Sequence, residues 1–448
     1  MRHHTLGFVM LSLSASVLMA CQSSQTVDRP PIQIIEGKAS VSTLPKEVRQ
    51  PAVVYTPKVQ HIAKEHVAIP QQTASPKQMH YASFSDWKAD FIRRAALQGY
   101  DTWRLENLLS QADYLSSVIS LDRSQAEFTK MPWEYVESAV SHNRIQQGRS
   151  KLNAYRTTLA DAESRYGVPK QIVAAIWGME SSYGTGMGNT DLVSALATLA
   201  YDGRRREFAE GELIAMMRMV ERGDVSPNQL KGSWAGGMGH TQFIPSTWLL
   251  HGVDANGDGY YSPWQASDAL SSTANYLGDA GWVRGLAPYY EVSLPTQFDY
   301  RLIGQKQSLD LWRQAGVLPV DEPFYGAAIA ELWLPAGIHG PALLITQNFD
   351  VIRVYNNSSS YALGVSLLAK RIGGGEGLSA AWPKHERPLS RTQVKMLQQK
   401  LTALGFDTQG IDGVAGSNTK KAFAKWQTAH GQIPDGFISL SSADALIW

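Results

Sequence analysis

One carboxyl group in the sequence has the spacing expected of a catalytic acid. Ile172, Ile176 and Glu180 are four residues apart in an otherwise apolar segment. On a helix they share one face, so the Glu180 carboxyl group stands at the end of an apolar stripe. Apolar surroundings disfavour the charged form and raise a carboxyl pKa, as a general acid requires near neutral pH. The alternative is a glutamate that caps the end of a surface helix.

Other side chains are candidates for a catalytic or binding role beside Glu180. Ser181, Ser182 and Tyr183 follow it directly, and their hydroxyl groups are expected to orient the carboxyl group. A second segment, GSWAGGMGHTQFIPS at 232–246, places glycines around aromatic and amide side chains. Glycines allow a backbone to approach a ligand closely, and serine or glutamine side chains can hydrogen-bond sugar substituents. His240 in this segment is a second candidate base, with a structural role as the alternative.

A third segment has the pattern of a cation-binding loop. Its oxygen donors at loop positions 1, 3, 5 and 7 are Asp254, Asn256, Asp258 and the carbonyl of Tyr260. Gly259 takes the turn position of an EF-hand loop, but Gln265 stands where that loop has a bidentate glutamate. Calcium in a structural role is therefore one interpretation, and an empty Asx/Gly turn or another cation is the alternative.

Bulk composition excludes some classes of function. The chain has 448 residues, too many for one compact core, and suggests two or three domains. Its formal net charge of +1 provides no basic field that would recruit nucleic acid. Its 13 Trp and 18 Tyr residues either line a sugar-binding cleft or fill the cores. Cys21 is the only cysteine, so the chain has no internal disulfide.

The N-terminus has the features of an export signal. The apolar run from Leu6 to Ala20 is too short to span a bilayer but suits a signal peptide. It ends in LMAC, which resembles a bacterial lipobox, and an ordinary signal peptide is the alternative. This resemblance implies a signal peptide over 1–20, lipidation of Cys21, and a membrane partner reached through that anchor. By resemblance to enterobacterial-type lipoprotein sorting, Gln22 in place of an aspartate implies the periplasmic face of the outer membrane.

The rest of the chain divides into three parts. Residues 21–77 are polar and rich in proline, which indicates a flexible tether. Residues 78–378 are expected to be mainly helical, because apolar residues such as Phe84, Trp87, Phe91 and Ala95 recur at helical spacing. Strand-like alternation is scarce before residue 320, and short strands are expected around 332–334 and 343–345. Residues 388–448 form a small helical unit, in which Val394, Leu397, Leu401 and Leu404 make the first stripe and Gly405 the helix end.

Four ordered motifs give the chain a family resemblance. WGMESSYG, GSWAGGMGHTQFIPSTW, SSTANYLGDAGW and NFDVIRVYNNSSSYALGV occur in the order found in the membrane-bound lytic murein transglycosylase B family, which the central region resembles. The resemblance implies a mainly α fold: a lysozyme-like catalytic core with an α-helical subdomain and a small three-helix C-terminal domain. The family acid matches Glu180, and the family residues of the sugar cleft match Ser233, Gln242, Tyr276, Tyr355, Asn356 and Tyr361.

The implied reaction needs one carboxyl group. Most glycosidases use two, either to hold a water molecule or to form a covalent intermediate. Enzymes of the resembled family cleave the β-1,4 bond between N-acetylmuramic acid and N-acetylglucosamine in peptidoglycan with the muramoyl C6 hydroxyl, and leave a 1,6-anhydromuramoyl end. Such intramolecular attack gains roughly 7–11 kcal/mol from proximity. The chain would then be a lyase of cell wall turnover that needs no cofactor for its chemistry.

The resemblance extends to the metal loop and the C-terminus. The family loop is longer than an EF-hand, and its last ligand matches Asp268. The segments from Leu397 to Gly416 and from Thr419 to Gly436 resemble a peptidoglycan-binding domain of the three-helix type. A generic helical domain that contacts other proteins, such as cell-wall enzymes, is the alternative. Two other functions stay open at this point: a muramidase that uses water, and an inactive wall-binding scaffold.

Overall fold

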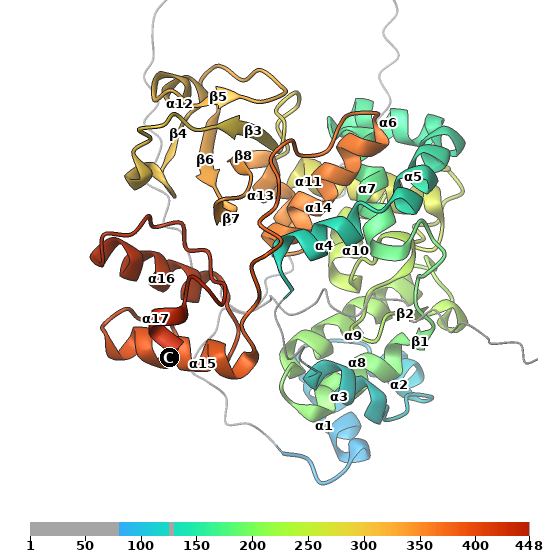
Figure 1. Cartoon of the computed structure of the whole chain (residues 1–448). Helices are drawn as coiled ribbons and strands as arrows, with labels where there is room; N and C mark the ends of the chain where they lie inside the picture. The colour runs from blue at the N-terminus through green and yellow to red at the C-terminus, as the bar shows by residue number, and fades with distance from the viewer. Residues whose placement is uncertain (1–79, 125–129, 448) are drawn as a thin grey trace, which may run out of the picture. The chain divides into compact units, whose positions relative to one another are not determined.

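The computed structural model describes residues 80–124 and 130–447 (Figure 1). The predicted signal peptide and the whole predicted tether, Cys21 included, lie outside the described residues. The described part is mainly helical, as the sequence predicts. It contains no helix that is both long and apolar enough to cross a membrane.

One hydrophobic core, called the α7 core below, surrounds the helix that carries Glu180. The side chains of Trp177, Phe349 and Tyr361 are almost fully buried in it. Its helices are α4 (Pro132–Ala139), α5 (His142–Ala154), α6 (Arg156–Tyr166), α7 (Lys170–Ser181), α11 (Ala266–Asp279), α13 (Gln347–Tyr355) and α14 (Ser359–Ile372). Helix α14 packs on α7, so residues that are far apart in the sequence face each other across the α7–α14 interface.

A second core, called the α8 core, forms around Trp87 and Trp248. Its helices are α1 (Phe84–Leu97), α2 (Thr102–Leu109), α3 (Ser116–Arg123), α8 (Leu192–Asp202), α9 (Arg206–Glu221) and α10 (Pro245–His251). Trp87, Phe91 and Ala95 of α1 are buried, which confirms the predicted stripe. The two-stranded ribbon β1 (Thr190–Asp191) and β2 (Lys231–Gly232) leads into the segment 232–246, called the glycine-rich loop below.

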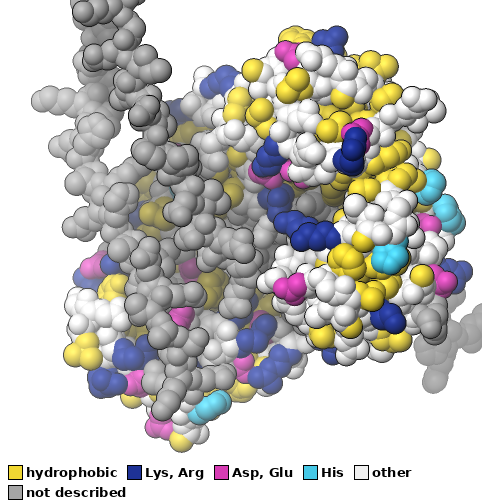
Figure 2. All heavy atoms as spheres, turned by 90° about the vertical axis from the view of Figure 1, so that its left-hand side faces the viewer, with side chains coloured by type: hydrophobic (Ala, Val, Ile, Leu, Met, Phe, Trp, Pro, Cys, Tyr) yellow, Lys and Arg dark blue, Asp and Glu magenta, His cyan; other side chains and the backbone are white. Residues whose placement is uncertain are grey.

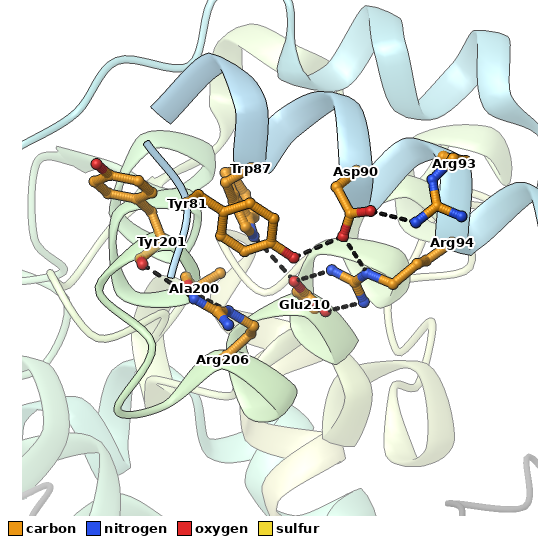
Figure 3. A network of polar contacts seen from close by, with 9 residues as sticks. All are labelled: Tyr81, Trp87, Asp90, Arg93, Arg94, Ala200, Tyr201, Arg206 and Glu210. Atoms are coloured by element: carbon orange, nitrogen blue, oxygen red, sulfur yellow. Dashed lines mark hydrogen bonds and ion pairs between the residues drawn. The ribbon is translucent and has the colours of Figure 1, made fainter. Parts of the chain in front are cut away.

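A polar network ties α1 to α9 (Figure 3). In this close-up, Trp87 and Arg94 of α1 both point at the carboxylate of Glu210 on α9. The Arg94 guanidinium donates two hydrogen bonds to Glu210, of 2.6 and 2.8 Å, and the Trp87 indole donates one of 2.9 Å. Arg94 also donates to Asp90, which accepts a hydrogen bond from Tyr81. The buried carboxylate is thus fully paired, and a buried ion pair needs that pairing to offset its desolvation.

A five-stranded antiparallel sheet interrupts the helices between α11 and α13. Its strand order is β4 (Lys306–Ser308), β6 (Ile329–Trp333), β8 (Ala342–Thr346), β3 (Tyr289–Ser293) and β5 (Leu318–Pro319). The helix α12 (Leu309–Gln314) follows β4, and β7 (Pro335–Ile338) lies between β6 and β8 in the sequence. Strands β6 and β8 confirm the two predicted runs.

The other three strands of the sheet were not predicted. β3 is buried on both faces, so its sequence lacks the alternation of apolar and polar residues by which a strand is recognised. Its Glu291 is only 1% exposed and accepts backbone hydrogen bonds from Ser379 and Ala380, which explains a charged residue there. β4 is a short polar edge strand, and β5 has only two residues.

The described residues of the C-terminal unit form three helices, as the family resemblance implies. They are α15 (Arg391–Ala403), α16 (Ser417–Ala429) and α17 (Asp444–Ile447), around buried Leu397, Phe423 and Trp426. Gly405 follows α15 with a φ of 88°, the conformation predicted for its helix end. On the face shown in Figure 2, acidic and basic side chains of the described residues are interspersed, in agreement with the net charge of +1.

Candidate active site

Glu180 occupies the C-terminal turn of α7, where the predicted apolar stripe ends. Ile172 and Ile176 are buried in the α7 core, and Glu180 is half-buried. Pro169 stands just before the helix, where its missing N–H costs nothing. The carboxyl group is therefore backed by packed apolar side chains while it stays accessible to a substrate.

The turn that follows Glu180 has an unusual backbone. Ser182 and Tyr183 have φ values of 48° and 61°, in the left-handed region that residues other than glycine rarely adopt. Two such residues cost roughly 1–3 kcal/mol each, so neighbouring contacts must hold them. The Tyr183 hydroxyl donates to the Arg144 carbonyl at 2.8 Å, and its ring lies against Gly178, where a Cβ would leave no room. Strain next to a candidate acid is typical of a functional site.

Burial determines the protonation of Glu180. Desolvation raises the pKa of its carboxyl group from 4.5 to about 7, against a smaller opposing effect of the hydrogen bond from Tyr361. The Tyr361 hydroxyl on α14 donates to Glu180 Oε1 at 2.6 Å. Among the described residues, no second carboxylate contributes to this pKa. The group is thus an acid that is about half protonated at neutral pH.

The expected partners of the carboxyl group were partly wrong. Ser181 and Tyr183 do not orient it, because the Ser181 hydroxyl donates to the His240 carbonyl and Tyr183 bonds to Arg144. The hydroxyl on Glu180 comes instead from Tyr361, which the family resemblance places in the cleft. Ser182 and Tyr183 form a left-handed turn, which could not be predicted from side-chain spacing.

The charge of Glu180 also raises the pKa of two further tyrosines, Tyr355 and Tyr135. The pKa of Tyr355 is raised well above its usual value by burial and then by the Glu180 carboxylate. The pKa of Tyr135 on α4 is raised by the same two causes. Tyr135 was not predicted, because it belongs to none of the motifs. It reaches the site because α4 packs on α14 at Gly364, where a Cβ would lie 3.1 Å from Ala139 Cβ and in contact with the Tyr135 ring.

The glycine-rich loop brings Ser233 and Gln242 together. A Cβ on Gly237 would lie 2.9 Å from Ser233 Oγ and 2.8 Å from Gln242 Oε1, so both side chains converge on this glycine. The Gln242 amide nitrogen donates to the Met187 and Gly239 carbonyls, which orients its oxygen. Gln242 has a φ of 52°, a third strained residue at the site.

The glycines of this loop allow close contacts between backbone segments. A Cβ on Gly232 would overlap the Gly237 carbonyl, and one on Gly239 would overlap the carbonyl of Pro263. The sequence-based interpretation was close approach to a ligand. In the structure these glycines allow chain segments to approach one another, which shapes the loop that presents Ser233 and Gln242.

Aromatic side chains connect this loop to α13. The Tyr355 hydroxyl donates to the Thr241 carbonyl at 2.7 Å. The rings of Phe243, Tyr276 and Tyr355 lie 5.6 to 5.8 Å from one another. Asn356 directly follows Tyr355 at the end of α13. The residues predicted for the sugar cleft therefore lie on three connected segments: the glycine-rich loop, α11 and the α13–α14 junction.

His240 is positioned by its neighbours. The Trp177 indole donates to His240 Nδ1 at 3.1 Å, and the two rings pack edge to face. Burial and the charge of Lys151 lower the pKa of the imidazole. The contact with α7 supports the structural alternative for this histidine.

The predicted metal loop lies between α10 and α11. The Asp254 carboxylate accepts hydrogen bonds from the Gly257 and Gly259 backbone, and Asp258 accepts them from Asn256 and Gln265. Asp268 is fully buried and closes the loop by accepting from Ala255 and Ser262. Its oxygen atoms suit a hard cation in chemical type. Within the described ranges, however, no three His, Cys, Asp or Glu side chains are gathered as a metal site.

Comparisons with known proteins agree with this architecture. Residues 83–370 match the family model of the transglycosylase SLT domain, and residues 390–446 match that of a peptidoglycan binding domain. The chain belongs to the transglycosylase SLT domain family. The predicted resemblance and the mainly helical, lysozyme-like class of fold are confirmed.

Individual relatives place the chain among lytic transglycosylases. Membrane-bound lytic murein transglycosylase B of Escherichia coli K12 is 34% identical over 289 residues, which are 61% of this chain and 79% of the relative. The solved structure of SltB3 from Pseudomonas aeruginosa, in complex with NAG-anhNAM-pentapeptide, is 42% identical with a TM-score of 0.77 and covers 82% of this chain and 100% of its own. E. coli Slt35 in complex with calcium is 33% identical with a TM-score of 0.57, over 66% of this chain and 96% of its own.

Proposed function

We propose that this chain is a lytic transglycosylase that cleaves the β-1,4 bond between N-acetylmuramic acid and N-acetylglucosamine in peptidoglycan and leaves 1,6-anhydromuramoyl ends. The single observation that carries the proposal is Glu180: one half-buried carboxyl group with a pKa of about 7 and no second carboxylate among the causes of its shift. Its family membership and the likeness to SltB3 bound to an anhydro sugar support the same class of enzyme.

Glu180 acts twice in the proposed reaction. In its protonated form it gives its proton to the glycosidic oxygen as the bond to C1 of the muramic acid breaks. The resulting carboxylate then takes the proton of the C6 hydroxyl as that oxygen bonds to C1. The Tyr361 hydroxyl donates to Glu180 Oε1 and stabilises the carboxylate between the two steps. No water is consumed, and the carboxyl group returns to its starting state.

The remaining cleft residues bind and orient the glycan. Ser233 and Gln242 converge beside Gly237 and offer a hydroxyl group and an amide oxygen to hydroxyl or acetamido groups. Tyr276 and Tyr355 offer aromatic surface, and Asn356 an amide, at the end of α13. Because Tyr355 also bonds to Thr241, it connects these two halves of the proposed cleft.

The product distinguishes this reaction from the hydrolytic alternative. Purified sacculi digested with the chain are expected to release anhydro-ended muropeptides, each lighter by one water than a reducing end. Glu180→Gln is expected to release none while it keeps its fold. Reducing ends would indicate a muramidase instead, and binding without release by the unaltered chain would indicate an inactive scaffold.

We propose that the C-terminal domain holds the enzyme on its insoluble substrate. A match to a peptidoglycan binding domain over residues 390–446 supports this role. Attachment raises the local enzyme concentration on the polymer. Removal of residues 388–448 is expected to weaken pelleting with sacculi more than cleavage of short soluble glycans. An equal loss in both assays would argue against the proposal.

Lipidation of Cys21 and a place on the periplasmic face of the outer membrane are also proposed. The lipobox-like LMAC sequence supports them, and the E. coli relative is described as membrane-bound. Cys21→Ser is expected to move the chain from the membrane fraction to the soluble fraction of cells. An unchanged membrane fraction would contradict a lipid anchor.

Calcium is proposed as a structural ligand of the loop after α10. Asp254, Asn256, Asp258 and the Tyr260 carbonyl would hold it, with Asp268 as the last ligand, and it would fix the loop without taking part in bond cleavage. Support comes from the oxygen donors of the loop and from the calcium complex of Slt35. Calcium is expected to raise the melting temperature of the chain but not that of Asp254→Asn. An equal effect on both proteins would exclude this site.

A further inference from the structure

The glycine-rich loop and the catalytic helix are joined through one residue, His240. Its carbonyl accepts a hydrogen bond from the Ser181 hydroxyl, next to Glu180, at 2.5 Å. Its ring nitrogen Nδ1 accepts one from the Trp177 indole of α7 at 3.1 Å. The backbone N–H of His240 donates to the Pro263 carbonyl at 2.9 Å. The residue thus fixes the loop to α7 from both its backbone and its side chain.

The neighbouring turn is built around the same ring. Gly184 follows the strained turn after Glu180, and a Cβ there would lie 2.5 Å from His240 Cε1 and Nδ1. The Gly184 N–H donates to the Ser181 hydroxyl, which completes the link from the turn to the loop. The next two loop residues are Thr241, whose carbonyl binds Tyr355, and Gln242. A shift of the His240 ring would therefore reach Glu180 on one side and two proposed cleft residues on the other.

The hydrogen bond with Trp177 specifies one tautomer of the imidazole. An indole N–H is only a donor, so Nδ1 must be unprotonated and a neutral ring carries its hydrogen on Nε2. Protonation of Nδ1 would set two N–H groups against each other and remove the bond. The hydrogen bond between Trp177 of α7 and the His240 ring therefore exists only while His240 is neutral.

We propose that His240 is a positioning residue whose neutral form holds the glycine-rich loop against α7, so that its protonation sets the acid limb of the enzyme's pH profile. This inference rests on the proposed function only for its kinetic readout. The structural part follows from the contacts of the ring.

The charged surroundings of the ring favour the neutral form. Lys151 on α5 is the charged side chain that acts on His240, and its Nζ lies 5.2 Å from the centre of the Trp177 ring. From the other sides, α7 contributes Trp177 and Ser181, the turn contributes Gly184, and the segment 263–264 contributes backbone groups. Burial first, and Lys151 second, lower the pKa of His240 below 6.5, while a backbone hydrogen bond with Trp264 opposes them.

The kinetic test uses two substitutions of different chemistry. His240→Asn introduces an amide whose Oδ1 is as many bonds from Cβ as Nδ1 of the imidazole, and this oxygen accepts a hydrogen bond without titrating. His240→Leu fills similar space without an acceptor. If Glu180 alone titrated, the rate would fall above about pH 7 and reach a plateau below it.

The two variants are expected to separate the roles of the ring. On a soluble glycan, the unaltered chain should lose kcat/KM again as the pH falls below 6.5, and His240→Asn should lack this acid limb. His240→Leu should lose about tenfold in kcat/KM across the range, because the buried indole N–H is left without a partner. Lys151→Met should move the acid limb to higher pH. Thermal unfolding at neutral pH checks that each variant is folded.

A spectroscopic test does not depend on turnover. The indole N–H resonance of Trp177, assigned by its loss in Trp177→Phe, should shift as the pH falls below 6.5 in the unaltered chain and stay constant in His240→Asn. A resonance that does not titrate in the unaltered chain, or an acid limb that persists in His240→Asn, would overturn the proposal. If the chain cleaved no glycan at all, the proposed function would fail while this titration still tested His240.

Discussion

Replacement of the candidate acid should make the protein more stable at alkaline pH. Glu180 is held in apolar surroundings that favour its protonated form, with a pKa of about 7 in place of 4.5. Glutamine has nearly the same shape and stays neutral at every pH. Glu180→Gln should therefore abolish activity and, above neutral pH, raise the free energy of unfolding.

The magnitude and its direction follow from proton linkage. The folded chain binds this proton more tightly than the unfolded chain, so the contribution of this group to stability is highest below pH 4.5 and falls as the pH rises to about 7. Each pKa unit corresponds to about 1.4 kcal/mol, so full ionisation of Glu180 costs roughly 3 kcal/mol. Relative to the unaltered chain, the glutamine variant should gain up to about 3 kcal/mol as the pH rises across this window.

Urea unfolding of both proteins at acidic and alkaline pH measures this difference. The hydrogen bond from Tyr361 to Glu180 Oε1 is available to glutamine as well, so it should contribute little to the change with pH. A difference between the two proteins that is equal at both pH values would refute the reasoning, because it would place Glu180 in a solvated environment. Gln146, an exposed residue on the neighbouring helix α5, offers a control site for Gln→Glu, which should show no comparable dependence on pH.

Three other substitutions test the surroundings of the site. Tyr361→Phe should lower kcat/KM about tenfold and move the alkaline limb of the rate to higher pH, because its hydrogen bond lowers the pKa of Glu180; an unmoved limb would contradict that contact. Gly239→Ala should cost about 3 kcal/mol or more in unfolding by urea, since a Cβ would overlap a backbone carbonyl at a φ of 63°. Arg94→Met should cost about 3 kcal/mol in the same assay by removing the Arg94 counterion of the buried Glu210 carboxylate, to which the Trp87 indole still donates. A loss below about 1 kcal/mol would argue against a paired buried charge.

The parts of the site that depend on local spacing could be predicted from the sequence. Ile172, Ile176 and Glu180 share a helical face because a helix repeats about every 3.6 residues. The structure confirms both the burial of the stripe and the raised pKa of the acid. The stripe that begins at Phe84 and the glycine after α15 are predictable for the same local reason.

The parts that depend on distant packing could not be predicted by spacing. Tyr361 reaches Glu180 across the interface between α7 and α14, although the two residues are 181 positions apart in the sequence. Tyr135 reaches the same carboxyl group from α4 without any motif around it. The strand β3 lacked alternation because it is buried on both faces, and only the position of its neighbours explains the buried Glu291.

The candidate active site lies where the two helical cores meet. Glu180 and Tyr361 lie on helices of the α7 core. The glycine-rich loop packs on the α8 core through the buried side chains of Met238 and Phe243. Tyr355 packs against both cores. Three strained residues lie on the two segments next to this border: Ser182 and Tyr183 on the turn after α7, and Gln242 on the glycine-rich loop. The two segments are joined by the hydrogen bond from the Ser181 hydroxyl to the His240 carbonyl. Loosening of either core should therefore displace the candidate acid relative to the glycine-rich loop.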